Sequence, residues 1–144
     1  MDNTSKTARF HIVICYIAFY LVFQATAYPQ ASELSEPMPL ALKTGFEKGD
    51  AGRISGFFNE TLSVELQNQA GIFNKNQVEM MLQEFFLKNP VDNYTVKRSG
   101  ITGVAGDVYF IGEILSGSVH FRVYLICSKV NNLHNIHSLS ITRI

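Results

Sequence analysis

Four consecutive segments with the alternation of β-strands fill the C-terminal part of this 144-residue chain and limit its fold more than any other feature. In each of them apolar residues alternate with polar or small ones, the period of a strand that buries one face. The tight turns Ser116-Gly117 and Asn131-Asn132 force neighbouring strands to run antiparallel. The sequence therefore predicts an antiparallel meander. Its strands are residues 94–101, 108–115, 119–129 and 134–143.

Two short helices are predicted at the start of the folded part. Met38, Leu42 and Phe46 recur four residues apart, which indicates a helix that begins near residues 37–39. Gly49 is a good left-handed cap for its end, and Asp50 is a good N-cap for a second helix. The apolar residues of this second helix are Ile54, Phe57 and Phe58.

A strand pair and the longest helix are predicted next. Residues 62–66 alternate as a strand, and residues 71–73 indicate a second short strand or a turn. Asn74 and Gln77 have the spacing of a capping box, and Asn89-Pro90 ends the helix. The apolar stripe of this helix is Val78, Met81, Leu82, Phe85 and Phe86. Helices followed by a meander predict an α+β fold with the helices on one face of the sheet.

The N-terminus has the pattern of a secretory signal peptide. Lys6 and Arg9 precede the apolar run 12–23, and the small-x-small sequence Ala25-Thr26-Ala27 follows. The apolar run is too short to span a bilayer as a helix, which needs roughly 20 residues. We expect cleavage near Ala27 and export to the periplasm or the exterior, with no membrane span in the mature chain.

The rest of the chain divides into a flexible lead-in, residues 28–38, and one α+β domain, residues 39–144. The chain has 12 basic and 12 acidic residues. Cleavage of residues 1–27 would remove two basic residues and one acidic residue, so the net charge of the mature chain is −1. No basic cluster is available for phosphate contacts, and we expect no nucleic-acid partner. Cys127 is the single cysteine after cleavage, so no intrachain disulfide forms.

The order of these elements resembles the cone-shaped nuclear-transport-factor-two-like (cystatin-like) superfamily. Four segments are similar to a family of short exported bacterial proteins with only a domain-of-unknown-function label. They are GDAGRISGFFN, GIFNKNQVEMMLQEFFLKNP, FRVYLI and IHSLSI. The resemblance implies a curved antiparallel sheet packed on a long helix and two short helices. It implies no single function, since this fold serves isomerases, dehydratases, ligand carriers and association domains.

Strand parity sorts the candidate site residues into two groups. The side chains of the apolar parity should point toward the helices, into the space between the long helix and the concave face of the sheet, which we call the cone. This group is expected to include three pocket candidates and Cys127. The pocket candidates are Tyr94, Arg98 and His137. The other parity should face away from the helices. Its partner-surface candidates are Tyr109, His120, Arg122 and Tyr124.

The inward group contains no Asp or Glu, and a histidine without an orienting acid is a weak base. We therefore assign no catalytic residue and no cofactor. His134 and His137 have opposite parity in a strand, so we expect no metal site. Cys127 has the apolar parity and is read as a core residue.

Two functions remain open. The first is an exported, noncatalytic binding or association domain. It is expected to form a homodimer through the outer sheet face, because Tyr and Arg are favoured at interfaces. The second is a carrier of a small apolar molecule in the cone, or an enzyme acting on one, gated by Tyr94, Arg98 and His137.

Overall fold

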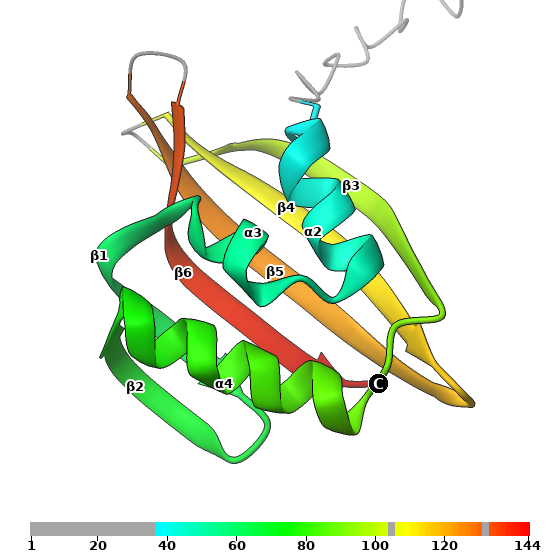
Figure 1. Cartoon of the computed structure of the whole chain (residues 1–144). Coiled ribbons are helices and arrows are strands. Elements are labelled where there is room, and N and C mark those ends of the chain that lie inside the picture. The colour runs from blue at the N-terminus through cyan, green and yellow to red at the C-terminus, as the bar shows by residue number, and fades with distance from the viewer. Residues whose placement is uncertain (1–36, 104–105, 131–132) are drawn as a thin grey trace, which may run out of the picture. The chain divides into compact units, whose positions relative to one another are not determined.

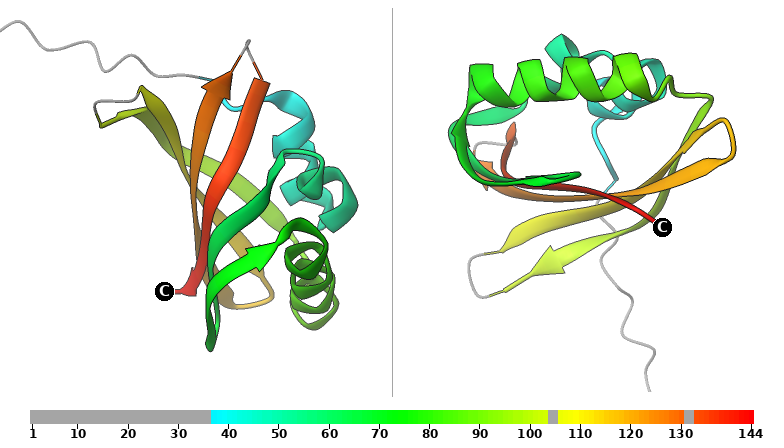
Figure 2. Two further views of the ribbon diagram at one scale, coloured as in Figure 1. Left: turned by 90° about the vertical axis from the view of Figure 1, so that its left-hand side faces the viewer. Right: turned by 90° about the horizontal axis from the view of Figure 1, so that it is seen from below.

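The computed structural model describes residues 37–144 except 104–105 and 131–132, all within the unit Glu33–Ile144. The predicted leader, residues 1–27, and the lead-in as far as residue 36 lie outside the described residues. A curved six-stranded sheet forms one layer, and the helices of this part of the chain pack on one of its faces (Figures 1 and 2). The helices are α2 (Leu40–Lys48), α3 (Ala51–Ser55) and α4 (Lys75–Lys88). The strands are β1 (Phe58–Leu66), β2 (Gln69–Asn74), β3 (Asn93–Thr102), β4 (Asp107–Ser116), β5 (Val119–Val130) and β6 (Leu133–Arg143).

The strand order across the sheet is β2-β1-β6-β5-β4-β3. The predicted meander is confirmed, since β3, β4, β5 and β6 pair antiparallel in sequence order. The β1–β2 hairpin joins this meander through β1, which runs parallel to β6. This one parallel pairing departs from the expected antiparallel sheet. No tight turn connects β1 to β6, so nothing local sets their relative direction.

The helix boundaries follow from capping residues that the sequence indicated. Gly49 ends α2 with φ 61°, a left-handed conformation that glycine adopts without a Cβ clash. The carboxylate of Asp50 accepts a hydrogen bond from the backbone N–H of Arg53 at 2.9 Å and starts α3. The predicted second helix is too long, however. The observed helix α3 ends at Ser55, and strand β1 begins at Phe58.

Helix α4 begins with the predicted capping box. The Asn74 side chain accepts from the Gln77 N–H at 2.9 Å, and the Gln77 side chain accepts from the Asn74 N–H at 3.0 Å. The helix ends at Lys88, one residue before Asn89, as expected. Its Val78, Leu82, Phe85 and Phe86 are buried against the sheet.

Aromatic rings fill the space between the helices and the sheet. Phe46 of α2 stacks on Tyr94 of β3, with ring centroids 5.0 Å apart. Phe85 of α4 meets Phe121 of β5 edge to face at 5.1 Å. All four side chains are at most 4% exposed. Met38, in the expected lead-in, also packs against this core.

Among the described residues, no helix is both long and apolar enough to cross a membrane.

Candidate functional site on the sheet

The side of the sheet that faces away from the helices is the main candidate surface, and we call it the outer face (Figure 2). The register of β4 and β5 pairs Tyr109 with Ile126, Ile111 with Tyr124, and Glu113 with Arg122. These six residues lie on the outer face, and all are half-buried or exposed. Their neighbours of the other parity, such as Phe110 and Val123, are fully buried on the helix side. The predicted parity of β4 and β5 is therefore confirmed.

Two tyrosines form an aromatic pair on the outer face. The rings of Tyr109 and Tyr124 have centroids 6.4 Å apart and are tilted by 40°. Tyr109 also covers Gly100 of β3, where a Cβ would come within 2.8 Å of the Tyr109 Cε1. A glycine at position 100 thus lets the Tyr109 ring lie close to the backbone of the neighbouring strand.

An ionised carboxylate lies beside the aromatic pair. Glu113 Oε1 is 2.6 Å from His120 Nδ1, and Glu113 Oε2 is 3.6 Å from Lys97 Nζ. The hydrogen bond from His120 is the main cause that lowers the pKa of Glu113, and the charge of Lys97 adds to it. Glu113 is therefore an anion at neutral pH. His120 is on the outer face, as its parity predicted.

Tyr94 points toward the helices, as expected, but it is a core residue. It is 3% exposed, and its hydroxyl lies 3.7 Å from Met38 Sδ. Its ring passes over Gly112, where an added Cβ would collide with the hydroxyl. Burial, with a smaller contribution from the charge of Glu47, raises the pKa of Tyr94 well above its usual range. The phenol stays protonated and helps to fill the cone.

The expected inward orientation of Arg98 is wrong. Val96 pairs with Gly112 and Arg98 pairs with Ile111, so Lys97 is an extra residue in a β-bulge. A bulge reverses the alternation beyond it, because one more residue stands against the same length of partner strand. Arg98 therefore shares the outer face with Ile111, and Ser99 takes the buried position instead.

His137, like Arg98, does not take the inward position expected for it. Ile136 pairs with Cys127 and Ser138 pairs with Ile126, so His137 is the extra residue of a second bulge. Its side chain is 34% exposed, and its Nε2 lies 3.1 Å from Asp107 Oδ2. The three pocket candidates are thus not brought together.

Asp107 is the acidic partner that sequence reasoning missed. The predicted strand began at Val108, and the bulge in β6 that lets His137 reach Asp107 has no sequence signature. In the described part of the chain no third metal-ligating side chain joins this pair.

Cys127 is a buried thiol, as its parity predicted. Burial, and to a smaller extent the negative charge of Asp107, raises the pKa of Cys127 to about 12. The thiolate, which is the nucleophilic form, is therefore not populated at neutral pH.

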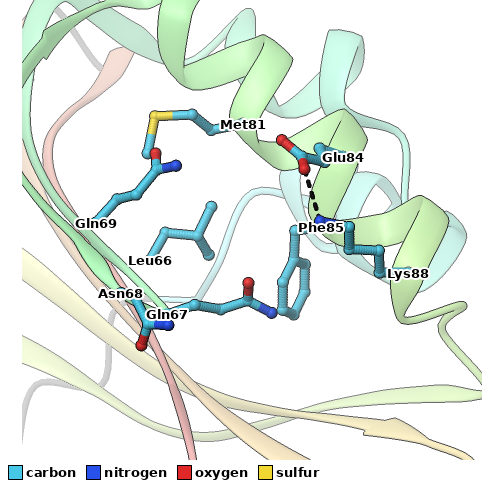
Figure 3. Close-up of a pocket in the computed structure, with 8 residues that line it drawn as sticks. All are labelled: Leu66, Gln67, Asn68, Gln69, Met81, Glu84, Phe85 and Lys88. Carbon is cyan, nitrogen blue, oxygen red and sulfur yellow. Dashed lines mark hydrogen bonds and ion pairs between the residues drawn. The ribbon is translucent and has the colours of Figure 1, made fainter.

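A small cavity of about 160 Å³ opens between the β1–β2 turn and α4 (Figure 3). The Gln67 side chain points toward the Phe85 ring, and the Met81 side chain points toward Gln69. An ion pair between Glu84 and Lys88, at 2.6 Å, lies on its helix side. Sequence reasoning missed this cavity because it forms only where the turn packs against the helix.

The fold is NTF2-like, or cystatin-like, as the sequence predicted. An NTF2-like protein of unknown function from Shewanella baltica superposes with a TM-score of 0.55 at 13% identity, over 72% of this chain and 86% of that one. An uncharacterised protein with a cystatin-like fold from Silicibacter pomeroyi gives a TM-score of 0.51 at 13% identity, over 72% of this chain and 71% of that one.

Within this class the chain belongs to the family described as Domain of unknown function (DUF4783), whose model matches residues 41–142. A solved DUF4783 protein from Bacteroides ovatus has a TM-score of 0.67 and 26% identity, over 74% of this chain and 96% of that one. A second, from Bacteroides fragilis, has a TM-score of 0.67 and 21% identity, over 75% of this chain and 100% of that one. No curated protein matches the chain.

Proposed function

We propose that this chain is an exported, noncatalytic association domain that binds a partner through the outer face of its sheet, with a second copy of the chain as the simplest partner. The observation that carries the proposal is the aromatic pair of Tyr109 and Tyr124, which no described helix covers. Ile111 and Ile126 lie directly opposite these tyrosines in the register of β4 and β5.

The composition of this surface supports the proposal. Tyrosine and arginine are enriched at the centres of protein interfaces, since they bury a large area and keep a polar group for hydrogen bonds. Tyr109 packs against Gly100 and is half-buried, so part of its side-chain freedom is already lost before a partner covers it. An isologous dimer places the same surface patch on both subunits, and a mostly apolar tyrosine and isoleucine patch suits that arrangement.

The test places charge in the outer face. Tyr124→Asp combined with Arg122→Asp should turn a wild-type dimer into a monomer in sedimentation, with the thermal transition largely kept, because both side chains are partly solvent-exposed. The control is Ile72→Asp on the edge strand β2, where the side chain is 79% exposed, and it should leave the dimer intact. A monomeric wild type, or equal dissociation by the control, would contradict the proposal.

A second candidate is a carrier of a small apolar molecule, or an enzyme acting on one. The observation that bears on it is the cavity of about 160 Å³ between the β1–β2 turn and α4, outside the cone, whose apolar lining is Leu66, Met81 and Phe85 and whose other five lining residues are polar or charged. Of the three expected gate residues, Tyr94 alone points into the cone, and Phe85 and Phe121 occupy its interior. Native mass spectrometry of the protein taken from its own envelope tests this candidate. A bound small molecule would support it, and its absence would count against it.

A further inference from the structure

A charged hollow of about 420 Å³ lies on the outer face, beside the aromatic pair. Its lining side chains are Lys97, Arg98, Ile111, Glu113, Arg122 and Ile144. Three of these side chains carry positive charge and one carries negative charge. The described residues as a whole are close to neutral, so this local excess of positive charge is a property of the hollow.

The β-bulge at Lys97 places Arg98 in the lining of the hollow. Without that extra residue, Arg98 would keep the parity of Tyr94 and point toward the helices. With it, Arg98 stands opposite Ile111 and shares the hollow with Arg122 of β5. Bulges recur next to binding sites because they redirect a side chain in this way.

Both guanidinium groups lack an acidic partner among the described residues. Glu113 is directly opposite Arg122 in the register, where a cross-strand ion pair would be expected. Its two oxygens are held instead by His120 at 2.6 Å and by Lys97 at 3.6 Å. Arg98 and Arg122 are therefore left with their hydrogen-bond donors open to the hollow.

We propose that this hollow binds a small organic carboxylate whose remaining part is apolar, held by Arg98 and Arg122 against Ile111 and Ile144. Arginine forms paired, parallel hydrogen bonds with the two oxygens of a planar carboxylate. The two isoleucines offer aliphatic surface to the rest of the ligand. The site takes the outer face as a binding surface, as in the proposed function, but it requires no second copy of the chain.

The experiment follows backbone amide signals of the ¹⁵N-labelled protein by NMR during titration with hexanoate. Saturable shifts are expected for Gly112, Glu113 and Arg122, which surround the hollow. Hexanamide, the neutral analogue, should give no saturable shift, and acetate should bind more weakly because it lacks the apolar chain. Equal binding of hexanamide, or of acetate, would overturn the proposal, as would the absence of saturable shifts with hexanoate.

The variants separate this site from general charge effects. Arg98→Gln and Arg122→Gln together should weaken hexanoate binding about tenfold or more, since each removes charge-assisted hydrogen bonds. Arg143→Gln, which removes an arginine outside the hollow, is the matched control and should bind like the wild type. Equal weakening by the control would refute the assignment. Unchanged signals elsewhere verify that the variants are folded.

Sedimentation of the same samples distinguishes the two proposals. A monomer that binds hexanoate through Arg98 and Arg122 supports the carboxylate site and contradicts the homodimer. A dimer that shows no saturable hexanoate shifts contradicts the carboxylate site and leaves the association surface standing.

Discussion

The same substitution at Gly112 of β4 and at Gly100 of β3 should have different effects, because each glycine lies under a different tyrosine. In Gly112→Ala the new Cβ would be 2.6 Å from Tyr94 Cζ. Tyr94 is 3% exposed and is stacked on Phe46, so its ring has no space into which it can move. In Gly100→Ala the new Cβ would be 2.8 Å from Tyr109 Cε1, but Tyr109 is half-buried on the outer face and can turn toward solvent.

The expected magnitudes follow from the packing on each side. Overpacking a buried site costs about 1–3 kcal/mol, while replacing glycine by alanine recovers about 0.4–1 kcal/mol by restricting the unfolded chain. For Gly112→Ala we expect the free energy of unfolding to fall by about 1–2 kcal/mol. For Gly100→Ala we expect a change within about 0.5 kcal/mol, because the half-buried Tyr109 ring can move aside and the gain from restricting the unfolded chain offsets the remaining strain.

Urea unfolding at one fixed protein concentration measures both variants. The Gly112→Ala midpoint should fall by roughly 0.5–1 M with an unchanged slope, since the slope for a small domain is about 1–3 kcal/mol per M. The Gly100→Ala midpoint should stay close to that of the wild type. Equal losses in the two variants, or a wild-type midpoint for Gly112→Ala, would refute the reasoning from ring mobility.

Further predictions test three other parts of the molecule. N-terminal sequencing of the exported protein should begin at Tyr28, and an intact N-terminus would exclude the leader. Cys127 should react with a thiol reagent at neutral pH only after unfolding, because its pKa is raised to about 12. Since the unfolded thiol ionises near pH 8.5, the contribution of Cys127 to stability should be lost as the pH rises from about 8.5 toward 12. His120→Gln should raise the pKa of Glu113 in a carboxyl ¹³C titration more than Lys97→Gln does, because the His120 hydrogen bond is the main cause of its lowered pKa. The stability that the lowered pKa of Glu113 contributes is present at neutral pH. It should be lost as the pH falls through the pKa of Glu113 in the folded protein.

Local signals were enough to predict most of the secondary structure. The caps at Gly49, Asp50 and Asn74 are where the sequence placed them, because capping depends on the residue itself and on partners within a few positions. Phe57 and Phe58 were the exception. Their spacing suits a helix, yet pairing with Ile136 of β6 draws Phe58 into β1.

The candidate site could be predicted only in part. Period-two alternation placed Tyr109, His120, Arg122 and Tyr124 on the outer face, because β4 and β5 pair with one another without a bulge. The same reasoning failed for Arg98, where one extra residue in β3 reverses the parity. A bulge depends on how two strands pair, and the sequence of one strand does not record it.

The sequence by itself determined the class of fold, the order of its elements and the face that most side chains of the central strands occupy. These properties depend on period, caps and turns, which act over a few residues. Only the tertiary structure decided that β1 runs parallel to β6, that Asp107 meets His137, and that Arg98 joins Arg122 beside Ile111. Each of these arrangements brings together residues far apart in the chain, through strand register and bulges.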